Sequence, residues 1–78
     1  MPTILRSSPY RIYFYSHEPN EIPHVHIDRD IQTCKFWLAP VSLLRNIGFN
    51  AKELRDIESI IVENEQKLLE AWNEYFRH

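Results

Sequence analysis

The first half of the chain carries the alternation of apolar and polar residues that predicts β-strands. Residues 24–28 (His-Val-His-Ile-Asp) and residues 34–38 (Cys-Lys-Phe-Trp-Leu) alternate with a period of two, the pattern of a strand with one buried face. Residues 10–15 are rich in aromatic and β-branched side chains, and Ser-Ser-Pro separates them from residues 3–6, so we expect two further strands there. Residues 41–47 are ambiguous, but a strand is favoured because a helix of that length would be very short.

The second half of the chain predicts one long helix. Asn50 is a good N-cap, and Glu53 follows three residues later at the capping-box position. From Leu54 to Tyr75, apolar residues recur at spacings of three, four and seven, which predicts one apolar face on a helix over residues 51–75. Asn64 interrupts this face within a polar segment, so we expect the helix to run past the sheet there or to meet another chain.

Together these elements predict an α+β fold, in which a small antiparallel sheet of four to five strands packs against one long C-terminal helix. A length of 78 residues allows only one small domain. We therefore expect a single domain over residues 1–78, with a β-rich half at residues 1–49 and the C-terminal helix in residues 50–78.

Composition excludes several classes of protein. A single glycine excludes the P-loop and the dinucleotide-binding fingerprint, which need several. Cys34 is the only cysteine, so it cannot form an intrachain disulfide, and its apolar strand face predicts an inert core thiol. No apolar run approaches the roughly 20 residues of a membrane span, and no signal-peptide core follows Met1. We expect a cytoplasmic protein without membrane association.

Charge is unevenly divided between the two halves. The net charge of −2 comes from 9 Lys+Arg against 11 Asp+Glu, which argues against a generic nucleic-acid coat protein. Residues 1–49 carry five basic and four acidic side chains, whereas residues 50–78 carry four and seven. Three of the four histidines also lie in the first half. We therefore expect any chemistry in the sheet and a scaffold or partner surface on the helix.

Two histidines share one face of a predicted strand. Strand alternation places His24 and His26 on the same side as Asp28 and opposite the apolar residues between them. A two-residue turn at residues 29–30 would then place His24 opposite Lys35 on the next strand. A one-residue slip of this register would exchange the two faces.

This histidine pair is compatible with three uses. The first is a divalent metal such as zinc, with His17 or a carboxylate as third ligand beside His24 and His26; otherwise no cofactor is expected. The second is acid–base catalysis, for example RNA cleavage with His26 as base, His24 or His17 as acid, and Arg29 or Lys35 as the cation. The third is structural, with both imidazoles hydrogen-bonded to neighbours.

Aromatic residues suggest two binding surfaces. Trp37 beside Lys35 could stack on a base next to a bound phosphate, with His17 closing over the same surface, although a half-buried tryptophan beside a surface lysine is the simpler interpretation. On the helix, a partner or a second copy of the chain could dock on the residues Leu68, Trp72, Tyr75 and Phe76. The simpler interpretation of these residues is packing of the helix on the sheet.

Several short motifs follow one another in a characteristic order. They are Met-Pro-Thr-Ile-Leu-Arg (1–6), Tyr-Arg-Ile-Tyr-Phe-Tyr-Ser (10–16), Pro-His-Val-His-Ile (23–27), Lys-Phe-Trp-Leu (35–38), Pro-Val (40–41), Gly-Phe (48–49) and the helical segment 53–76. Over essentially the whole chain this order resembles a small bacterial family, domain-of-unknown-function family 4160. The chain departs from the family pattern at Ile22, where a proline is frequent, at Ala39, where an acid is frequent, and in lacking glycine around residues 30–31.

The resemblance implies a function that the residues alone do not give. Members of this family are typically encoded beside another small protein, and the pair resembles a type II toxin–antitoxin module in which this chain is the toxin. We therefore expect a toxin that acts on RNA through the histidine face. Its expected partner is an antitoxin-like small protein. The alternatives are a non-enzymatic interaction module and a metal-binding protein. The resemblance carries no catalytic role for the His-Val-His and Lys-Phe-Trp motifs.

Overall fold

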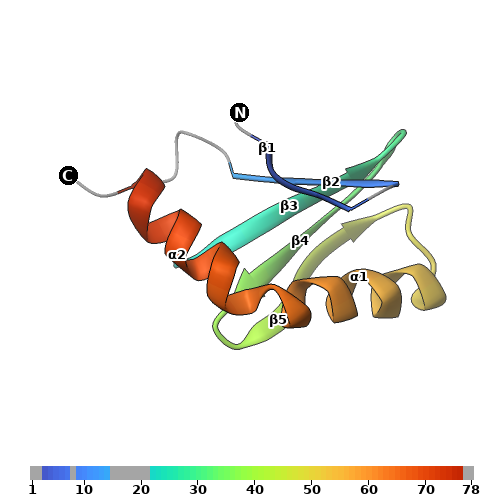
Figure 1. The fold of residues 1–78 in the computed structure, drawn as a ribbon. Helices are drawn as coiled ribbons and strands as arrows, with labels where there is room; N and C mark the ends of the chain where they lie inside the picture. Colours follow the sequence, from blue (N-terminus) through green and yellow to red (C-terminus); the bar gives the residue numbers. More distant parts are fainter. Residues whose placement is uncertain (1–2, 8, 15–21, 77–78) are drawn as a thin grey trace.

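The computed structural model of the chain describes residues 3–7, 9–14 and 22–76, and contains five strands followed by two helices (Figure 1). The strands are β1 (Thr3–Ser7), β2 (Tyr10–Tyr13), β3 (His24–Arg29), β4 (Gln32–Leu38) and β5 (Val41–Ile47). The helices are α1 (Ala51–Glu63) and α2 (Glu65–Tyr75). The strand predicted at residues 41–47 is confirmed as β5.

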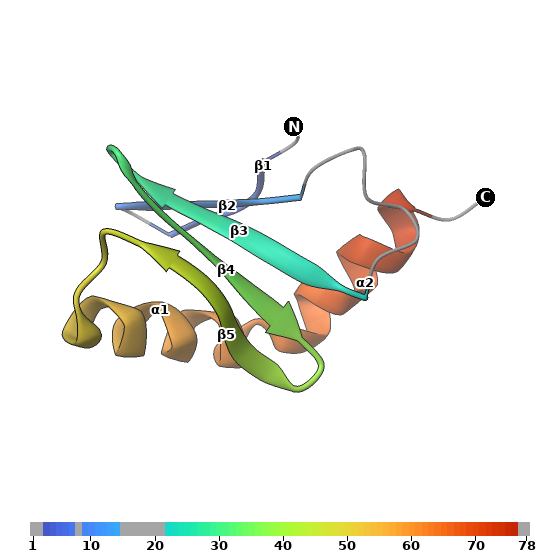
Figure 2. The same ribbon diagram turned by 180° about the vertical axis from the view of Figure 1, so that it is seen from behind.

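The strands form one antiparallel sheet in the order β1-β2-β3-β4-β5, so each strand pairs with its neighbour in the sequence. Both helices lie on the same side of this sheet (Figures 1 and 2). We call the side that carries the helices the inner face and the opposite side the outer face. The predicted α+β class and the antiparallel pairing are confirmed.

The register of the β3–β4 hairpin differs from the predicted one. Its turn lies at residues 30–31, so His26 pairs with Lys35 and His24 with Trp37. The first turn residue is an aspartate with φ 55°, a left-handed conformation that short polar side chains tolerate. The predicted pairing of His24 with Lys35 is therefore wrong by two residues. Because this shift is even, every side chain keeps its predicted face.

The predicted single helix is divided in two at Asn64. The Asn64 side-chain amide donates to the carbonyl oxygen of Ile60 at 2.8 Å, and its backbone N–H lies 3.1 Å from the carbonyls of both Ile60 and Ile61. Asparagine side chains compete in this way for the backbone acceptors of a helix. The long helix is therefore corrected to α1 and α2, and the polar interruption at Asn64 marks the break.

The start of α1 follows the sequence prediction. The Asn50 side-chain oxygen accepts a hydrogen bond from the Glu53 backbone N–H at 2.8 Å, as an N-cap does. The Glu53 carboxylate instead reaches the sheet, where the Tyr10 hydroxyl and the Arg29 guanidinium donate to it. Glu53 thus joins α1 to two strands.

The hydrophobic core fills the space between the inner face and the helices. Its buried members are Tyr10, Ile12, Phe14, Val25, Ile27, Cys34, Phe36, Leu38, Phe49, Ile57, Ile61, Leu68 and Trp72. Leu68 and Trp72 are 0% and 4% exposed, so the prediction that they form a partner-binding surface is wrong. The simpler alternative, packing of the helix on the sheet, is confirmed for both. They are buried because α2 turns its apolar face toward the sheet.

No helix in the described part of the chain is long and apolar enough to cross a membrane.

Candidate functional site

Most of the side chains that the sequence predicts as site residues in the sheet lie on the outer face. Strand pairing places residues from four strands on this side: Arg11 and Tyr13 from β2, His24, His26 and Asp28 from β3, Thr33, Lys35 and Trp37 from β4, and Arg45 and Ile47 from β5. These residues share a face because directly paired side chains in an antiparallel sheet point to the same side. The outer face is therefore polar and aromatic, in contrast to the apolar inner face.

A row of rings crosses the outer face. The Arg11 guanidinium lies 4.6 Å from the centre of the Tyr13 ring, and Tyr13 stacks on His26 with ring centres 5.4 Å apart. His26 in turn meets His24 edge to face, also at 5.4 Å. His24 then contacts the ring of Trp37 at 5.9 Å. The predicted proximity of the two histidines is confirmed, and Trp37 lies at the end of their row.

Both histidines are almost fully buried. His24 is 1% exposed and His26 is 7% exposed, although they lie on the outer face. The Nδ1 atom of His24 lies 2.7 Å from the carbonyl oxygen of Ile22. Since a carbonyl oxygen only accepts, Nδ1 carries a proton in this bond. His24 is the first residue of β3, and at this end of the strand its ring also lies 5.2 Å from the ring of Trp72 on α2, so it contacts a helix as well as the outer-face rings. This environment matches the structural use of the pair.

Asp28 is held by hydroxyl groups on both sides. The Tyr13 hydroxyl donates to its two carboxylate oxygens at 3.1 and 3.0 Å, and the Thr33 hydroxyl donates at 2.7 Å. Behind it, Cys34 is 3% exposed, and burial together with the nearby Asp28 charge raises the pKa of the thiol to about 12. A thiol that keeps its proton at neutral pH is a poor nucleophile, so an inert Cys34 is supported.

The accessible part of the outer face includes three cations and one tryptophan. Arg11, Lys35 and Trp37 are half-buried, and Arg45 is exposed. Lys35 and Arg45 pair directly across β4 and β5, which brings two positive charges together on one side of the sheet. Arg11 and Arg45 are not among the predicted site residues. The signal that identifies them is register, which the sequence pattern of a single strand does not contain.

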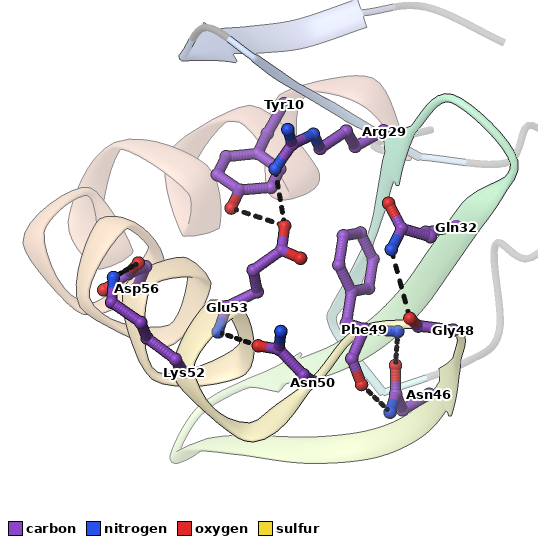
Figure 3. Close-up of polar contacts among 10 residues, drawn as sticks. All are labelled: Tyr10, Arg29, Gln32, Asn46, Gly48, Phe49, Asn50, Lys52, Glu53 and Asp56. Atoms are coloured by element: carbon purple, nitrogen blue, oxygen red, sulfur yellow. Dashed lines mark hydrogen bonds and ion pairs between the residues drawn. The ribbon is translucent and has the colours of Figure 1, made fainter.

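Arg29 does not belong to the outer face. Its guanidinium forms an ion pair with the Glu53 carboxylate at 2.7 Å on the inner side of the sheet (Figure 3). The Tyr10 hydroxyl donates to the same carboxylate oxygen at 3.2 Å. The hydrogen bond and charge of Glu53 raise the pKa of Arg29, while burial, reinforced by Glu53, raises the pKa of Tyr10. Placing Arg29 beside the histidines is therefore wrong, because odd positions of β3 face the helices.

The remaining predicted site residue, His17, precedes β3 in the sequence and lies outside the described residues. Over the parts of the chain that are described, no three His, Cys, Asp or Glu side chains gather in a group that could hold a metal ion. A metal site that uses His24, His26 and His17 stays a prediction.

The end of α2 carries the other two predicted partner residues. Tyr75 is 41% exposed and Phe76 is half-buried. Their rings lie 4.9 Å apart, and each ring centre is 6.2 Å from that of Phe14. The two residues therefore close the end of the core and leave part of Tyr75 at the surface. A role for them in binding a partner stays a prediction.

A comparison with known proteins gives a match to a protein family. No curated protein and no solved structure matches the chain. A family model described as Domain of unknown function (DUF4160) matches residues 10–73, which include β2 to β5, α1 and most of α2. The chain belongs to the DUF4160 family.

Proposed function

We propose that this protein binds single-stranded RNA on the outer face of its sheet and serves as the toxin of a type II toxin–antitoxin pair. The observation that carries the proposal is that Arg11, Lys35, Arg45 and Trp37 share the side of the sheet opposite to α1 and α2. The toxin role rests on the family resemblance and gives the RNA-binding surface its biological context.

The charges of the outer face support an anionic ligand. Its described strand residues include three cations but only one carboxylate, Asp28, which accepts hydrogen bonds from Tyr13 and Thr33. The chain as a whole has a net charge of −2. Positive charge is thus concentrated where phosphates can approach, and phosphate contacts dominate the affinity of proteins for nucleic acids.

Trp37 supports single-stranded rather than double-stranded RNA. It is half-buried, so part of its side chain is open to a ligand while its ring stays in contact with His24. Bases stack on aromatic side chains of exposed sheet surfaces, and only unpaired bases offer a face for stacking. Lys35 pairs with Arg45 on the same side, which suits a backbone phosphate next to a stacked base.

The same geometry favours binding over cleavage by the histidines. A general base must come within hydrogen-bond reach of the proton that it removes, whereas His24 is 1% exposed and bonded to a backbone carbonyl. Arg29, the predicted cation for a phosphorane, faces the helices. We therefore propose that the toxin acts by occupying RNA, with His24 and His26 supporting the ring row beneath the ligand.

Fluorescence anisotropy with a labelled single-stranded RNA tests the binding proposal. For three phosphate contacts, the logarithm of the binding constant should fall with the logarithm of salt concentration at a slope of about −2. Arg45→Glu should weaken binding and reduce this slope by about 0.7. Lys67→Glu changes the total charge equally on exposed α2 and should leave binding intact. Equal effects of the two variants would exclude the outer face as the binding surface.

Expression in bacteria tests the toxin proposal separately. Wild-type protein should arrest growth, the Arg45→Glu variant should arrest it less, and co-expression of the neighbouring gene should restore it. A wild-type protein that is harmless in every host would remove the toxin role and leave the RNA-binding measurement to stand or fall by itself.

A further inference from the structure

The edge strand β5 is unusually apolar for its exposure. It is the last strand of the sheet, and Leu43, Leu44 and Ile47 are 43%, 40% and 48% exposed. An edge strand presents unpaired backbone N–H and C=O groups, and natural proteins usually protect such an edge with charges, proline or a covering element. Here Arg45 is the one charged residue among seven. The edge thus combines apolar side chains with open backbone groups.

A bulge divides β5 into two parts. Lys35 pairs with Arg45 and the next β4 residue, Phe36, pairs with Leu43, so Leu44 is an extra residue between the two pairs. A bulge re-aims side chains and interrupts regular pairing. The segment from Arg45 to Ile47 can therefore accept a strand, while Leu43 and Leu44 offer adjacent apolar contacts beside it.

Charge identifies the kind of strand that fits. Neither β4 nor β5 contains an acidic residue, whereas they carry Lys35 and Arg45 as a direct cross-strand pair. A second copy of β5 would bring another Arg45 and no carboxylate, so it would place like charges side by side at this edge. A partner strand with carboxylates toward the outer face would place one of them beside Arg45, and its alternate apolar residues would lie on the inner side.

We propose that β5 is the docking edge for an extended segment of a partner protein in which apolar and acidic residues alternate, and that this segment adds to the sheet as a sixth strand. Backbone hydrogen bonds supply affinity in such strand addition, and the alternate side chains supply specificity. Because one of its carboxylates would occupy Arg45, the partner segment would compete with RNA for that cation; this consequence rests on the function proposed above.

The test is an NMR titration of the ¹⁵N-labelled protein with a capped peptide of alternating valine and glutamate, without RNA. Amide shifts should concentrate in residues 41–47, and Arg45→Glu should weaken binding about fivefold, the size expected for an exposed ion pair. The Arg45→Glu protein should instead prefer a valine–lysine peptide. The Lys67→Glu control should bind the valine–glutamate peptide like wild type.

Three results would overturn the docking proposal. The first is the absence of amide shifts on β5, and the second is equal binding of both peptides to the wild-type protein. The third is a wild-type dimer, seen in sedimentation, that blocks peptide binding and persists in the Arg45→Glu variant. Since the titration contains no RNA, failure here leaves the RNA-binding proposal untouched. Conversely, a protein that binds the peptide but no RNA would keep the docking edge and lose the proposed function.

Discussion

The buried thiol of Cys34 should make the fold sensitive to alkali. Cys34 pairs with Ile27 on β3 and Asn46 on β5 and is 3% exposed. Burial in the core, and secondarily the charge of Asp28, raises its pKa from 9.0 to about 12. The unfolded chain releases this proton near pH 9, whereas the folded chain keeps it. The stabilising effect is therefore complete below pH 9 and is lost as the pH rises toward 12.

The size of this effect follows from the pKa difference. Each pKa unit corresponds to about 1.4 kcal/mol, so about 2 kcal/mol of the free energy of unfolding should be lost between about pH 9 and pH 10.5. Cys34→Ala removes the titrating group and keeps a small apolar side chain. Tyr10, whose pKa is also raised, titrates in both proteins and cancels from the comparison.

The assay is urea unfolding of wild type and Cys34→Ala, followed by circular dichroism at about pH 8 and about pH 10.5. The stability difference between the two proteins should shift by about 2 kcal/mol in favour of Cys34→Ala at the higher pH. A difference that stays constant within about 0.5 kcal/mol would refute the reasoning, because the folded thiol would then titrate like an exposed one.

Four further substitutions test the packing of the helices and the turn before them. Asn50→Ala removes the N-cap bond of α1 and should lower the free energy of unfolding by about 1 kcal/mol in urea titrations. Gly48→Ala should lower the thermal midpoint, at a cost of about 1 kcal/mol or more, because its φ is 99° and the new Cβ would lie 3.0 Å from the Gln32 side chain. Trp72→Ala should cost about 3–5 kcal/mol, whereas Tyr75→Ala should cost much less because its side chain is 41% exposed; equal losses of stability in calorimetry would contradict the placement of Trp72 in the core.

Local patterns were sufficient for the five strands and their faces, but not for the division of the predicted long helix into α1 and α2. The alternation around His24 and His26 places Val25 and Ile27 inward, and the structure agrees. The N-cap at Asn50 also follows from a local rule, because its partner is only three residues away. Information of this kind lies within a few neighbouring residues, so a single sequence contains it.

Contacts between residues far apart in the sequence cannot be predicted from such local patterns. Arg29 pairs with Glu53, 24 positions away, and no local pattern predicts this partner. The predicted turn at residues 29–30 takes Arg29 out of the strand alternation, whereas in the structure it is an odd position of β3 and faces the helices. The hairpin register depended on the ability of Asp30 to adopt a positive φ. A shift of the turn by one position moved each cross-strand pair by two, which is why the faces were right and the partners wrong.

The histidine pair illustrates the limit of a motif. The His-Val-His pattern predicts two imidazoles side by side, and their rings are 5.4 Å apart. The pattern does not predict that Tyr13 and Trp72 pack against them, because these rings come from other strands and from α2. The spacing of the two histidines therefore predicts their proximity but not their burial.

The most direct test of the RNA-binding proposal is an NMR map of the surface that contacts a short single-stranded RNA. We expect the largest shifts at the Trp37 indole N–H and at the amides of Lys35 and Arg45, with little change along α1 and α2. Shifts confined to the helices, or no shifts at low salt, would contradict an RNA-binding outer face.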